Sequence, residues 1–316
     1  MLLTRQKKRV IIAGLLLLFL ILIYGIITVN AKAVRIAVLF SNANTPYQEA
    51  LTGFKQYLNE QGVEIDLNVH DLNGSKVTAG EAIKTISKEG ARIIFTLGTF
   101  STNEVLDQIK SVPIIAGMIL KTEKLKGVQN ATGIILDFPV ETQFEMMRRL
   151  LPNARAIGVL YNPEQNNEFI RKAAETAKKM DLNLVLKEVH TPQELPDALR
   201  TLSKTADALW GINDSVVYTP ETAKHILLFS YRNQIPFIGL SSEWVKAGAL
   251  YSLDRDYKSI GRQCGEMAYK ILQGADAGSI PLSGPREVLY SLNLKTAQQM
   301  KINFPEAVIQ KAQTRY

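Results

Sequence analysis

Residues 92–97 read Arg-Ile-Ile-Phe-Thr-Leu and are followed at once by Gly-Thr-Phe-Ser-Thr-Asn-Glu at residues 98–104. The first run is almost continuously apolar and rich in β-branched residues, which is typical of a strand buried on both faces. The second run ends in a capping box at residues 101–104, which predicts that a helix starts directly after the strand. A buried strand followed by a helix is the repeating unit of a parallel sheet covered by helices.

The same alternation extends along the chain in both directions. Apolar runs predict two sets of five strands, at residues 34–40, 64–69, 92–97, 113–118 and 131–136, and at residues 156–161, 183–189, 208–212, 236–240 and 249–253. Helix starts are predicted after strands at Thr45-Pro46, Thr191-Pro192 and Thr219-Pro220, where a hydroxyl precedes a proline. In a parallel sheet these helix N-termini gather at the carboxyl edge of the strands, where ligands bind.

The two strand sets occupy roughly 285 residues, which exceeds one comfortable core, so the sequence predicts two similar α/β lobes. A helix at residues 257–273, which ends before Gly274, is followed by a strand at residues 288–292 and a short helix. No Gly- or Ser-rich linker separates the lobes, which favours a hinge made of crossing strands.

The first segment is predicted to be an address rather than part of the fold. Basic residues at positions 5, 7, 8 and 9 precede a run at residues 10–29 that carries no charge, so the rest of the chain should lie outside the cytoplasm. Residues 1–31 are thus a signal peptide or an N-terminal membrane anchor. The length favours an anchor, whereas the small residues of Val29-Asn30-Ala31 suit a signal peptidase.

Composition and missing motifs exclude several functions. The net charge is +7, and the four basic residues of the leader account for four of it; no basic stripe follows, so nucleic acid is not expected as a partner. The single cysteine, Cys264, forbids an internal disulfide and lies on the apolar face of its helix. The three histidines stand alone and the nucleophile, phosphate and dinucleotide motifs are missing, so no enzyme, metal site or cofactor is expected.

Four stretches carry a family resemblance. They are Leu-Pro-Asn-Ala-Arg-Ala-Ile-Gly-Val-Leu-Tyr-Asn-Pro at residues 151–163, Asp-Ala-Leu-Trp at 207–210 with Asn213-Asp214 after it, Gly-Ala-Leu at 248–250, and Asp256-Tyr257 followed by Gly-Arg-Gln-Cys-Gly-Glu-Met-Ala at 261–268. With them, nearly the whole region after the leader resembles the ABC-transporter substrate-binding family that includes tryptophan- and tyrosine-type binding proteins. That family is built on the type I periplasmic-binding fold.

The resemblance implies an α/β fold of two Rossmann-like lobes with parallel sheets, which clamp a ligand between them. The chain would cross between the lobes near Pro139, Asp254 and Pro281. The first lobe would then contain residues 34–140 and 255–280, and the second residues 141–254 and 281–316. Gly261 and Gly265 would let the helix at residues 257–273 lie close to its neighbour.

The loops that follow the strands are expected to line the cleft. Polar, mostly uncharged side chains predominate there, which suits a small solute held by hydrogen bonds. The residues expected at the ligand are Ser41, Asn42, Thr45, Thr99, Ser101, Thr102, Met118, Tyr161, Asn162, Asn167, Glu168, Asn213, Asp214, Ser241, Trp244 and Asp254.

Some of these residues have both a functional and a structural interpretation. Asp214 matches a family aspartate that is suited to an amino group, and it could equally be an Asx cap. The hydroxyls at residues 99–102 could receive a carboxylate or simply cap a helix. Trp244 could stack on a planar solute or pack in its loop. Glu168 replaces a family serine and would repel a carboxylate, although a carboxylate in a first helical turn is also favoured by the helix dipole.

The sequence therefore predicts an extracytoplasmic receptor that delivers a small molecule to the permease subunits of an ABC importer. The family resemblance favours an amino-acid-like molecule, whereas the residues that replace family residues favour a different solute. The alternative is a membrane-anchored sensor or orphan binding protein that reports ligand occupancy to another membrane protein. The expected state is a monomer, which is the default for this fold.

Overall fold

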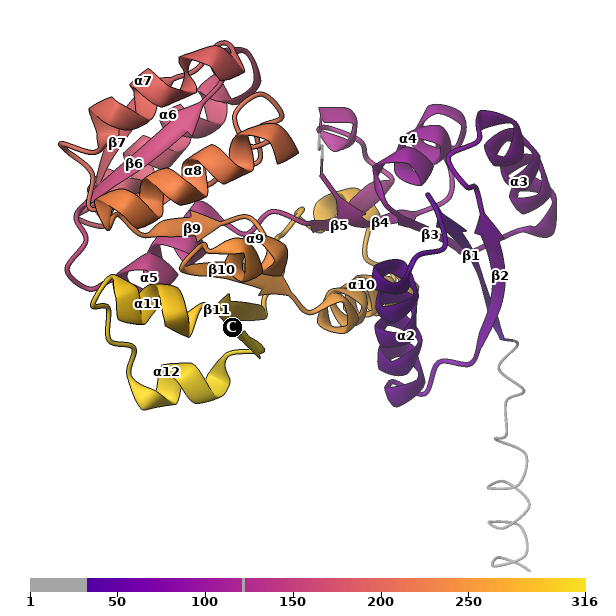
Figure 1. Cartoon of the computed structure of the whole chain (residues 1–316). Helices are drawn as coiled ribbons and strands as arrows, with labels where there is room; N and C mark the ends of the chain where they lie inside the picture. The colour runs from indigo at the N-terminus through magenta and orange to yellow at the C-terminus, as the bar shows by residue number, and fades with distance from the viewer. Residues whose placement is uncertain (1–32, 121–122) are drawn as a thin grey trace, which may run out of the picture.

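The computed structural model describes residues 33–120 and 123–316 (Figure 1). It contains two α/β bodies side by side, one built around a five-stranded sheet and the other around a seven-stranded sheet. The predicted signal peptide or anchor at residues 1–31 lies outside the described residues. Within the described ranges, no helix combines the length and the apolar character needed to cross a membrane.

The five-stranded sheet is parallel throughout and has the order β2-β1-β3-β4-β5. Its strands are β1 (Val34–Phe40), β2 (Ile65–Asp71), β3 (Ile93–Leu97), β4 (Ile114–Ile119) and β5 (Ala131–Ile135). Helices α3 (Lys76–Glu89) and α4 (Thr99–Gln108) pack on one face, and α2 (Thr45–Glu60) packs on the other. Because both faces are covered, β3 and β4 are buried along their whole length, as their apolar sequences predict.

The seven-stranded sheet has the order β12-β11-β10-β9-β8-β6-β7, and only the β10–β11 pair is antiparallel. Its strands are β6 (Ala156–Tyr161), β7 (Asn183–Glu188), β8 (Ala208–Trp210), β9 (Phe237–Gly239), β10 (Tyr251–Arg255), β11 (Val288–Leu292) and β12 (Thr314–Arg315). Its helices are α5 (Val140–Leu150), α6 (Pro163–Lys179), α7 (Leu195–Leu202), α8 (Pro220–Asn233), α9 (Ser242–Ala247), α11 (Leu294–Gln299) and α12 (Glu306–Lys311). Short 3₁₀ turns are η1 (Glu123–Leu125), η2 (Pro192–Glu194) and η3 (Ala277–Ser279).

Helix α10 (Tyr257–Leu272) follows a strand of the seven-stranded sheet but packs against α2 of the other body (Figure 1). The two helices touch backbone to backbone. A Cβ atom placed on Gly261 would lie 1.8 Å from the carbonyl oxygen of Ala50, and one on Gly53 would lie 1.9 Å from that of Lys258. The prediction that Gly261 permits a close approach is therefore confirmed.

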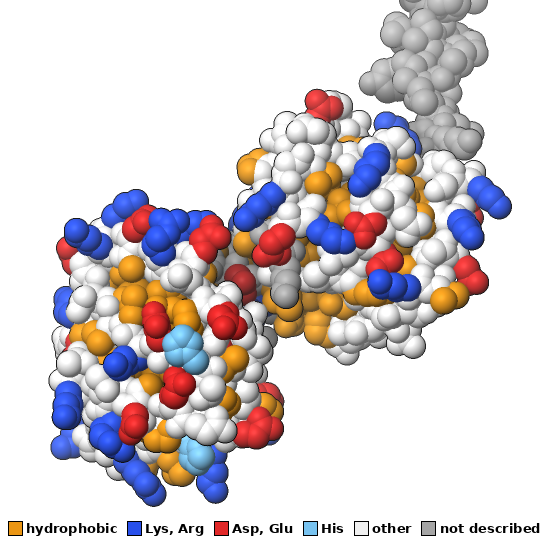
Figure 2. Space-filling model, turned by 90° about the horizontal axis from the view of Figure 1, so that it is seen from above, with side chains coloured by type: hydrophobic (Ala, Val, Ile, Leu, Met, Phe, Trp, Pro, Cys, Tyr) orange, Lys and Arg blue, Asp and Glu red, His pale blue; other side chains and the backbone are white. Residues whose placement is uncertain are grey.

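Three segments pass between the sheets: one after β5, one after β10 and one before β11. The third crossing lies later than Pro281, where the sequence places it. Ser283 still hydrogen-bonds to the backbone of Gly133 and Ile135 at strand β5, so the crossing begins only after it. On the face shown in Figure 2, the two bodies meet at a narrow connection, and acidic and basic side chains are interspersed over both.

Several helix starts differ from their predicted positions. The N-cap of α2 is Asn44 rather than Thr45, because the Asn44 side chain accepts the hydrogen bond from the amide of Tyr47. Helix α4 starts at Thr99 after Gly98, so the predicted capping box at residues 101–104 lies inside its first turns. The predicted start at Thr191 is a 3₁₀ turn that precedes α7. The predicted helix start at Thr219 is confirmed, and the structure shows a capping box between Thr219 and Thr222 there.

Glu266 of α10 ties that helix to the third crossing. Its carboxylate accepts hydrogen bonds from Arg286, at 2.6 Å, and from Lys270, at 2.8 Å. These two bonds lower the pKa of Glu266 from 4.5 to about 2. A carboxyl whose pKa is lowered by folding contributes stability above its unfolded pKa, and that contribution is lost as the pH falls toward its folded pKa.

We therefore expect Glu266→Gln to lower the free energy of unfolding at pH 7 by up to about 1 kcal/mol, the range of partly exposed ion pairs. The difference from wild type should stay constant above pH 4.5 and shrink as the pH falls toward 2. Urea unfolding of both proteins at pH 7, 4 and 2.5 measures this. Glu145→Gln, on the exposed surface of α5, is the control, and an equal loss at pH 7 and pH 2.5 would exclude the ion pairs as the cause.

Candidate functional site

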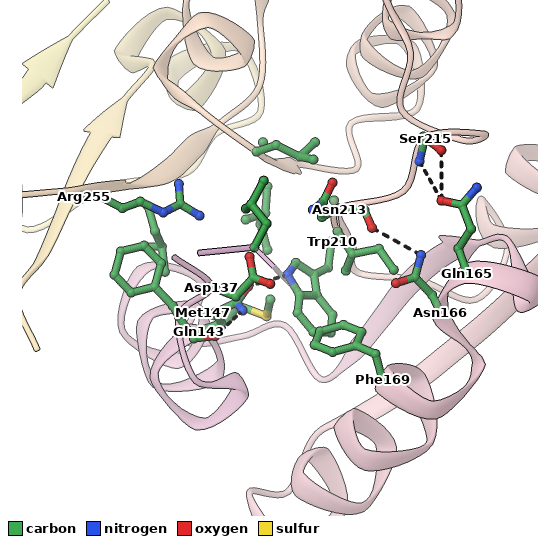
Figure 3. A pocket seen from close by; sticks show the side chains of 18 of the residues that line it. Asp137, Gln143, Met147, Gln165, Asn166, Phe169, Trp210, Asn213, Ser215 and Arg255 are labelled. Atoms are coloured by element: carbon green, nitrogen blue, oxygen red, sulfur yellow. Dashed lines mark hydrogen bonds between the residues drawn. The ribbon is translucent and has the colours of Figure 1, made fainter. Parts of the chain in front are cut away.

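A cavity of about 900 Å³ lies at the carboxyl ends of the strands of the seven-stranded sheet (Figure 3). Its walls come from one face of α5, from the N-terminal part of α6, from the ends of β8 and β9 with the residues after them, and from one face of β10. Asp137 and Phe138, in the crossing after β5, also line it, as do Leu120 and Glu123 of the five-stranded body. Elements of both bodies therefore bound the cavity.

Strand β10 presents a stripe of three side chains to this cavity. Tyr251, Leu253 and Arg255 alternate along the strand and all line the cavity, as residues on one face of a strand do. The stripe runs roughly 13 Å from Arg255, beside the crossing, to Tyr251 in the interior. The Tyr251 hydroxyl is buried and has no hydrogen-bond partner among the described residues. Burial raises the pKa of this hydroxyl, so it is neutral and can both donate and accept.

Trp210, at the end of β8, forms an apolar wall of the cavity with Phe169 and Met147 (Figure 3). The ring centroids of Trp210 and Phe169 lie 5.9 Å apart. The indole nitrogen of Trp210 donates to Oε1 of Gln143 at 3.0 Å, and Nε2 of Gln143 donates to the carbonyl of Phe138 at 3.0 Å. These bonds fix the orientation of the indole ring, so the apolar wall is formed in advance of any ligand.

Two opposite charges lie where the chain crosses between the bodies. Arg255 donates from Nε to the carbonyl of Leu136 at 2.7 Å, and its guanidinium lies 5.3 Å from the centroid of the Phe138 ring. Asp137 and Arg255 both line the cavity, yet neither forms an ion pair with another described residue. Burial raises the pKa of Asp137, and the positive charge of Arg255 opposes that rise.

Amide side chains at the start of α6 form the polar edge of the cavity (Figure 3). Asn166 donates to the carbonyl of Asn213 at 3.2 Å. Oε1 of Gln165 accepts from the amide and the hydroxyl of Ser215, at 3.1 and 3.0 Å. These bonds fasten the loop after β8 to α6, so Asn213 is held at the edge of the cavity.

Asn213 is the one residue of the predicted set that lines the cavity. Its neighbour Asp214 is 3% exposed, and its carboxylate accepts four hydrogen bonds from the protein. Oδ2 accepts from the amide of Asn162 and the side chain of Asn166, and Oδ1 accepts from the amides of Val216 and Val217. In this structure Asp214 is the cap of its own loop, which is the structural alternative, and it does not face the cavity.

The other residues predicted in the seven-stranded body also have protein partners. Tyr161 donates to Oε1 of Glu188, and Glu168 forms an exposed ion pair one turn along α6. The ring of Trp244 packs edge to face on two aromatic neighbours. Asp254 accepts hydrogen bonds from two serine hydroxyls. It lies between Leu253 and Arg255 on β10, so it is on the opposite face of the strand from the residues that line the cavity. Three more predicted residues lie outside the cavity lining: Asn162 is the N-cap of α6, Asn167 lies on the exposed face of that helix, and Ser241 precedes α9.

The residues predicted in the five-stranded body lie at the carboxyl edge of that sheet and outside the cavity lining. Ser101 donates its amide hydrogen to Oγ of Ser41 at 3.0 Å, and the hydroxyl of Thr102 donates to the carbonyl of Gly98 at 2.8 Å. Thr99 accepts from the amide of Leu120 at 3.1 Å. Asn42 and Thr45 are exposed and Met118 is buried. Their role at a ligand stays a prediction.

Sequence reasoning missed Asp137, Gln143, Trp210, Tyr251 and Arg255. Trp210 and Tyr251 looked like core strand residues, and Gln143 like a surface residue of a helix. Asp137 and Arg255 could have been noticed in the sequence. Each is a charged residue next to one of the first two predicted crossings, and a charge is unusual in a segment that must pack between two bodies. Most of the predicted site residues lie in loops after strands or near the starts of the helices that follow, whereas Tyr251 and Arg255 lie within a strand.

A model of the ABC transporter substrate binding protein family matches residues 34–315. The chain belongs to this family. It is 27% identical to a tyrosine-binding protein of Clostridioides difficile (strain R20291) over 259 residues, which are 78% of this chain and 73% of that protein. The family binds substrates rather than converting them, so this substrate-binding protein is not an enzyme.

Solved structures share its fold. One is the ligand-free, open structure of a substrate binding protein with adhesive properties from Clostridium difficile, with a TM-score of 0.73, 21% identity and coverage of 89% of this chain and 98% of the other. Another is the ABC domain from Streptococcus pneumonia in complex with L-Trp, with a TM-score of 0.58, 20% identity and coverage of 90% and 100%. The predicted α/β, type I periplasmic-binding fold is confirmed. Proteins of this family act outside the cytoplasm, bind small solutes and typically work with ABC permeases.

Proposed function

We propose that this substrate-binding protein delivers a small, amino-acid-like solute to an ABC importer, and that the solute binds in the cavity between the two bodies. The observation that carries the proposal is the cavity itself. Its volume of about 900 Å³ is in the range of small-molecule sites, and it combines an apolar wall with a few fixed polar groups. The family match supports the transport role.

The relatives support the amino-acid part of the proposal, because their names and titles mention tyrosine and L-Trp. From the sequence, Glu168 is expected to repel a carboxylate on the solute. That residue is exposed and paired with Lys172 at 2.7 Å, outside the cavity lining, so its charge is neutralised locally. Glu168 therefore does not count against a solute that carries a carboxylate.

Binding of the solute should close the two bodies on each other, because Leu120 and Glu123 reach the cavity from the opposite side. Leu120 is half exposed in this structure and would be covered on closure. The importer proposal further expects the protein to act as a monomer at the outer face of the membrane, held there by residues 1–31 if they are not cleaved. No observation favours the alternative of a sensor.

A thermal-shift screen of the purified protein, from residue 32 onward, against L-amino acids and sugars tests the function. A solute at 100 times its dissociation constant should stabilise the fold by about 2.7 kcal/mol. Deletion of the gene should abolish uptake of the same solute by cells. A shift with sugars alone would contradict the amino-acid part, and unchanged uptake would contradict the importer.

Phe169→Ala should weaken the binding of the solute by about tenfold, because the apolar wall loses a half-buried aromatic ring. Isothermal titration calorimetry measures the affinity, and circular dichroism checks that the variant is folded. The control is Tyr231→Ala, which removes a half-exposed aromatic ring on α8 that does not line the cavity. Equal affinities of wild type and Phe169→Ala would place the solute elsewhere.

A further inference from the structure

Two of the charged side chains that line the cavity, Asp137 and Arg255, are half-buried and carry opposite charges. Asp137 and Arg255 stand in the crossings after β5 and at the end of β10, and neither is ion-paired with a described residue. A charge that is removed from water without a partner is costly, and closure of the two bodies would remove water from both. A solute that supplies both counter-charges would remove this cost.

The position of Arg255 is fixed. Its Nε donates to Leu136 and its guanidinium lies over the Phe138 ring, which leaves the two terminal nitrogens without a hydrogen-bond partner among the described residues. Two nitrogens in one plane match the two oxygens of a carboxylate. In Figure 3 Arg255 and Asp137 lie on the same side of the Trp210 ring.

The remaining charges of the lining are acidic. Glu123 and Glu164 lie at its exposed edge, where water screens them. Arg255 is therefore the one basic side chain among the described residues that line the cavity, so this part of the lining offers a partner for a single carboxylate. A second carboxylate on the solute would find no second basic partner among the described lining residues and would be repelled by Glu123 and Glu164.

We propose that Arg255 binds the carboxylate and Asp137 the ammonium group of a zwitterionic solute, whose third substituent lies along the β10 stripe toward Trp210 and Tyr251. The inference rests on the proposed function of this cavity. It goes beyond that function because it assigns the charges of the solute to residues and excludes acidic amino acids. The unpartnered hydroxyl of Tyr251 marks the inner end of the stripe, where the substituent can meet a hydrogen-bonding group.

The experiment compares three forms of one probe by titration calorimetry: L-tyrosine, L-tyrosinamide, which lacks the carboxylate, and N-acetyl-L-tyrosine, which lacks the ammonium group. The same three forms of L-tryptophan and L-leucine follow, with L-glutamate as the acidic probe. Wild type should bind at least one free amino acid, and should bind its amide and its N-acetyl form tenfold to a hundredfold more weakly, which is the usual loss when a hydrogen bond to a charged group is removed. L-glutamate should not bind.

The variants assign each loss to a residue. Arg255→Met should weaken binding of the free amino acid and abolish the preference over the amide, while the preference over the N-acetyl form stays. Asp137→Asn should also weaken binding of the free amino acid, but it should abolish the preference over the N-acetyl form while the preference over the amide stays. A variant that merely disturbed the fold would weaken all three forms equally, and the wild-type comparison does not depend on any variant.

The outcomes separate the two proposals. If an amino acid binds and its amide and N-acetyl forms bind equally well, or if both variants keep the wild-type preferences, the assignment of charges is wrong and the proposed function stands. If no amino acid binds and a solute of another class does, the amino-acid part of the proposed function fails together with the assignment. Tight binding of L-glutamate would overturn the single-carboxylate site.

Discussion

Gly261→Ala is expected to lower the free energy of unfolding by about 3 kcal/mol or more, at the upper end of the cost of overpacking a core. The added methyl group would lie 1.8 Å from the carbonyl oxygen of Ala50, which is backbone and cannot turn away. Helices α2 and α10 would have to separate. Their separation would open the core that Phe54, Cys264 and Ile260 form with the five-stranded sheet. Urea unfolding followed by circular dichroism measures the loss.

The matched control is the same substitution in another helix. Gly80 lies within α3, and a Cβ atom there would have nothing within 4 Å. Gly80→Ala should therefore stabilise the protein by roughly 0.5–1 kcal/mol, because alanine loses less conformational freedom in a helix than glycine does. If both variants were equally stable, the close contact of α2 and α10 would not exist in solution.

Asp214→Asn is expected to cost about 3 kcal/mol, although the two side chains have nearly the same shape. The carboxylate accepts four hydrogen bonds, two on each oxygen. Asparagine offers one oxygen, and its amide group would point hydrogen atoms at two donors. Buried donors without a partner are costly, especially where they had faced a charge. Equilibrium unfolding in urea, with the binding of L-tyrosine measured in parallel, gives the result.

Asp181→Asn is the control, because it makes the same aspartate-to-asparagine substitution at an exposed position. Asp181 is exposed and has a φ of 56°, which asparagine also adopts readily, so its stability should stay within about 0.5 kcal/mol of wild type. A stable Asp214→Asn protein that has lost its affinity for amino acids would restore Asp214 to the ligand and contradict the capping role.

Much of the fold could be predicted because its strands are buried on both faces. The runs at residues 34–40, 156–161 and 288–292 are strands with the predicted bounds, and the other predicted strands differ by one or two residues at an end. Short β12 was missed, because two residues give no pattern. Helix starts were harder to place, because neighbouring residues can each serve as the N-cap. Asn44 rather than Thr45 is the N-cap of α2, and Gly98 rather than Ser101 precedes α4. Tertiary contacts decide which residue takes the position.

The site could be predicted only in part. Its location at the carboxyl edge of the strands follows from the alternation of strands and helices. Its residues do not, because the cavity is lined along β10 rather than by loops alone. In the sequence, Tyr251 and Leu253 look like buried strand residues, and nothing local shows that one face of the strand borders a cavity. Asp214 illustrates the opposite error, since its partners come from a neighbouring helix and from its own loop.

The position of α10 has a consequence for biosynthesis. The core of the five-stranded body includes Ile260, Met267 and Ile271 of that helix, so the body cannot complete its core until more than a hundred later residues have been made. The two bodies therefore cannot mature one after the other on the ribosome, as consecutive domains do. Contacts between residues so distant in the chain also slow folding. A polypeptide that stays unfolded until nearly its full length is synthesised is well suited to export before it folds.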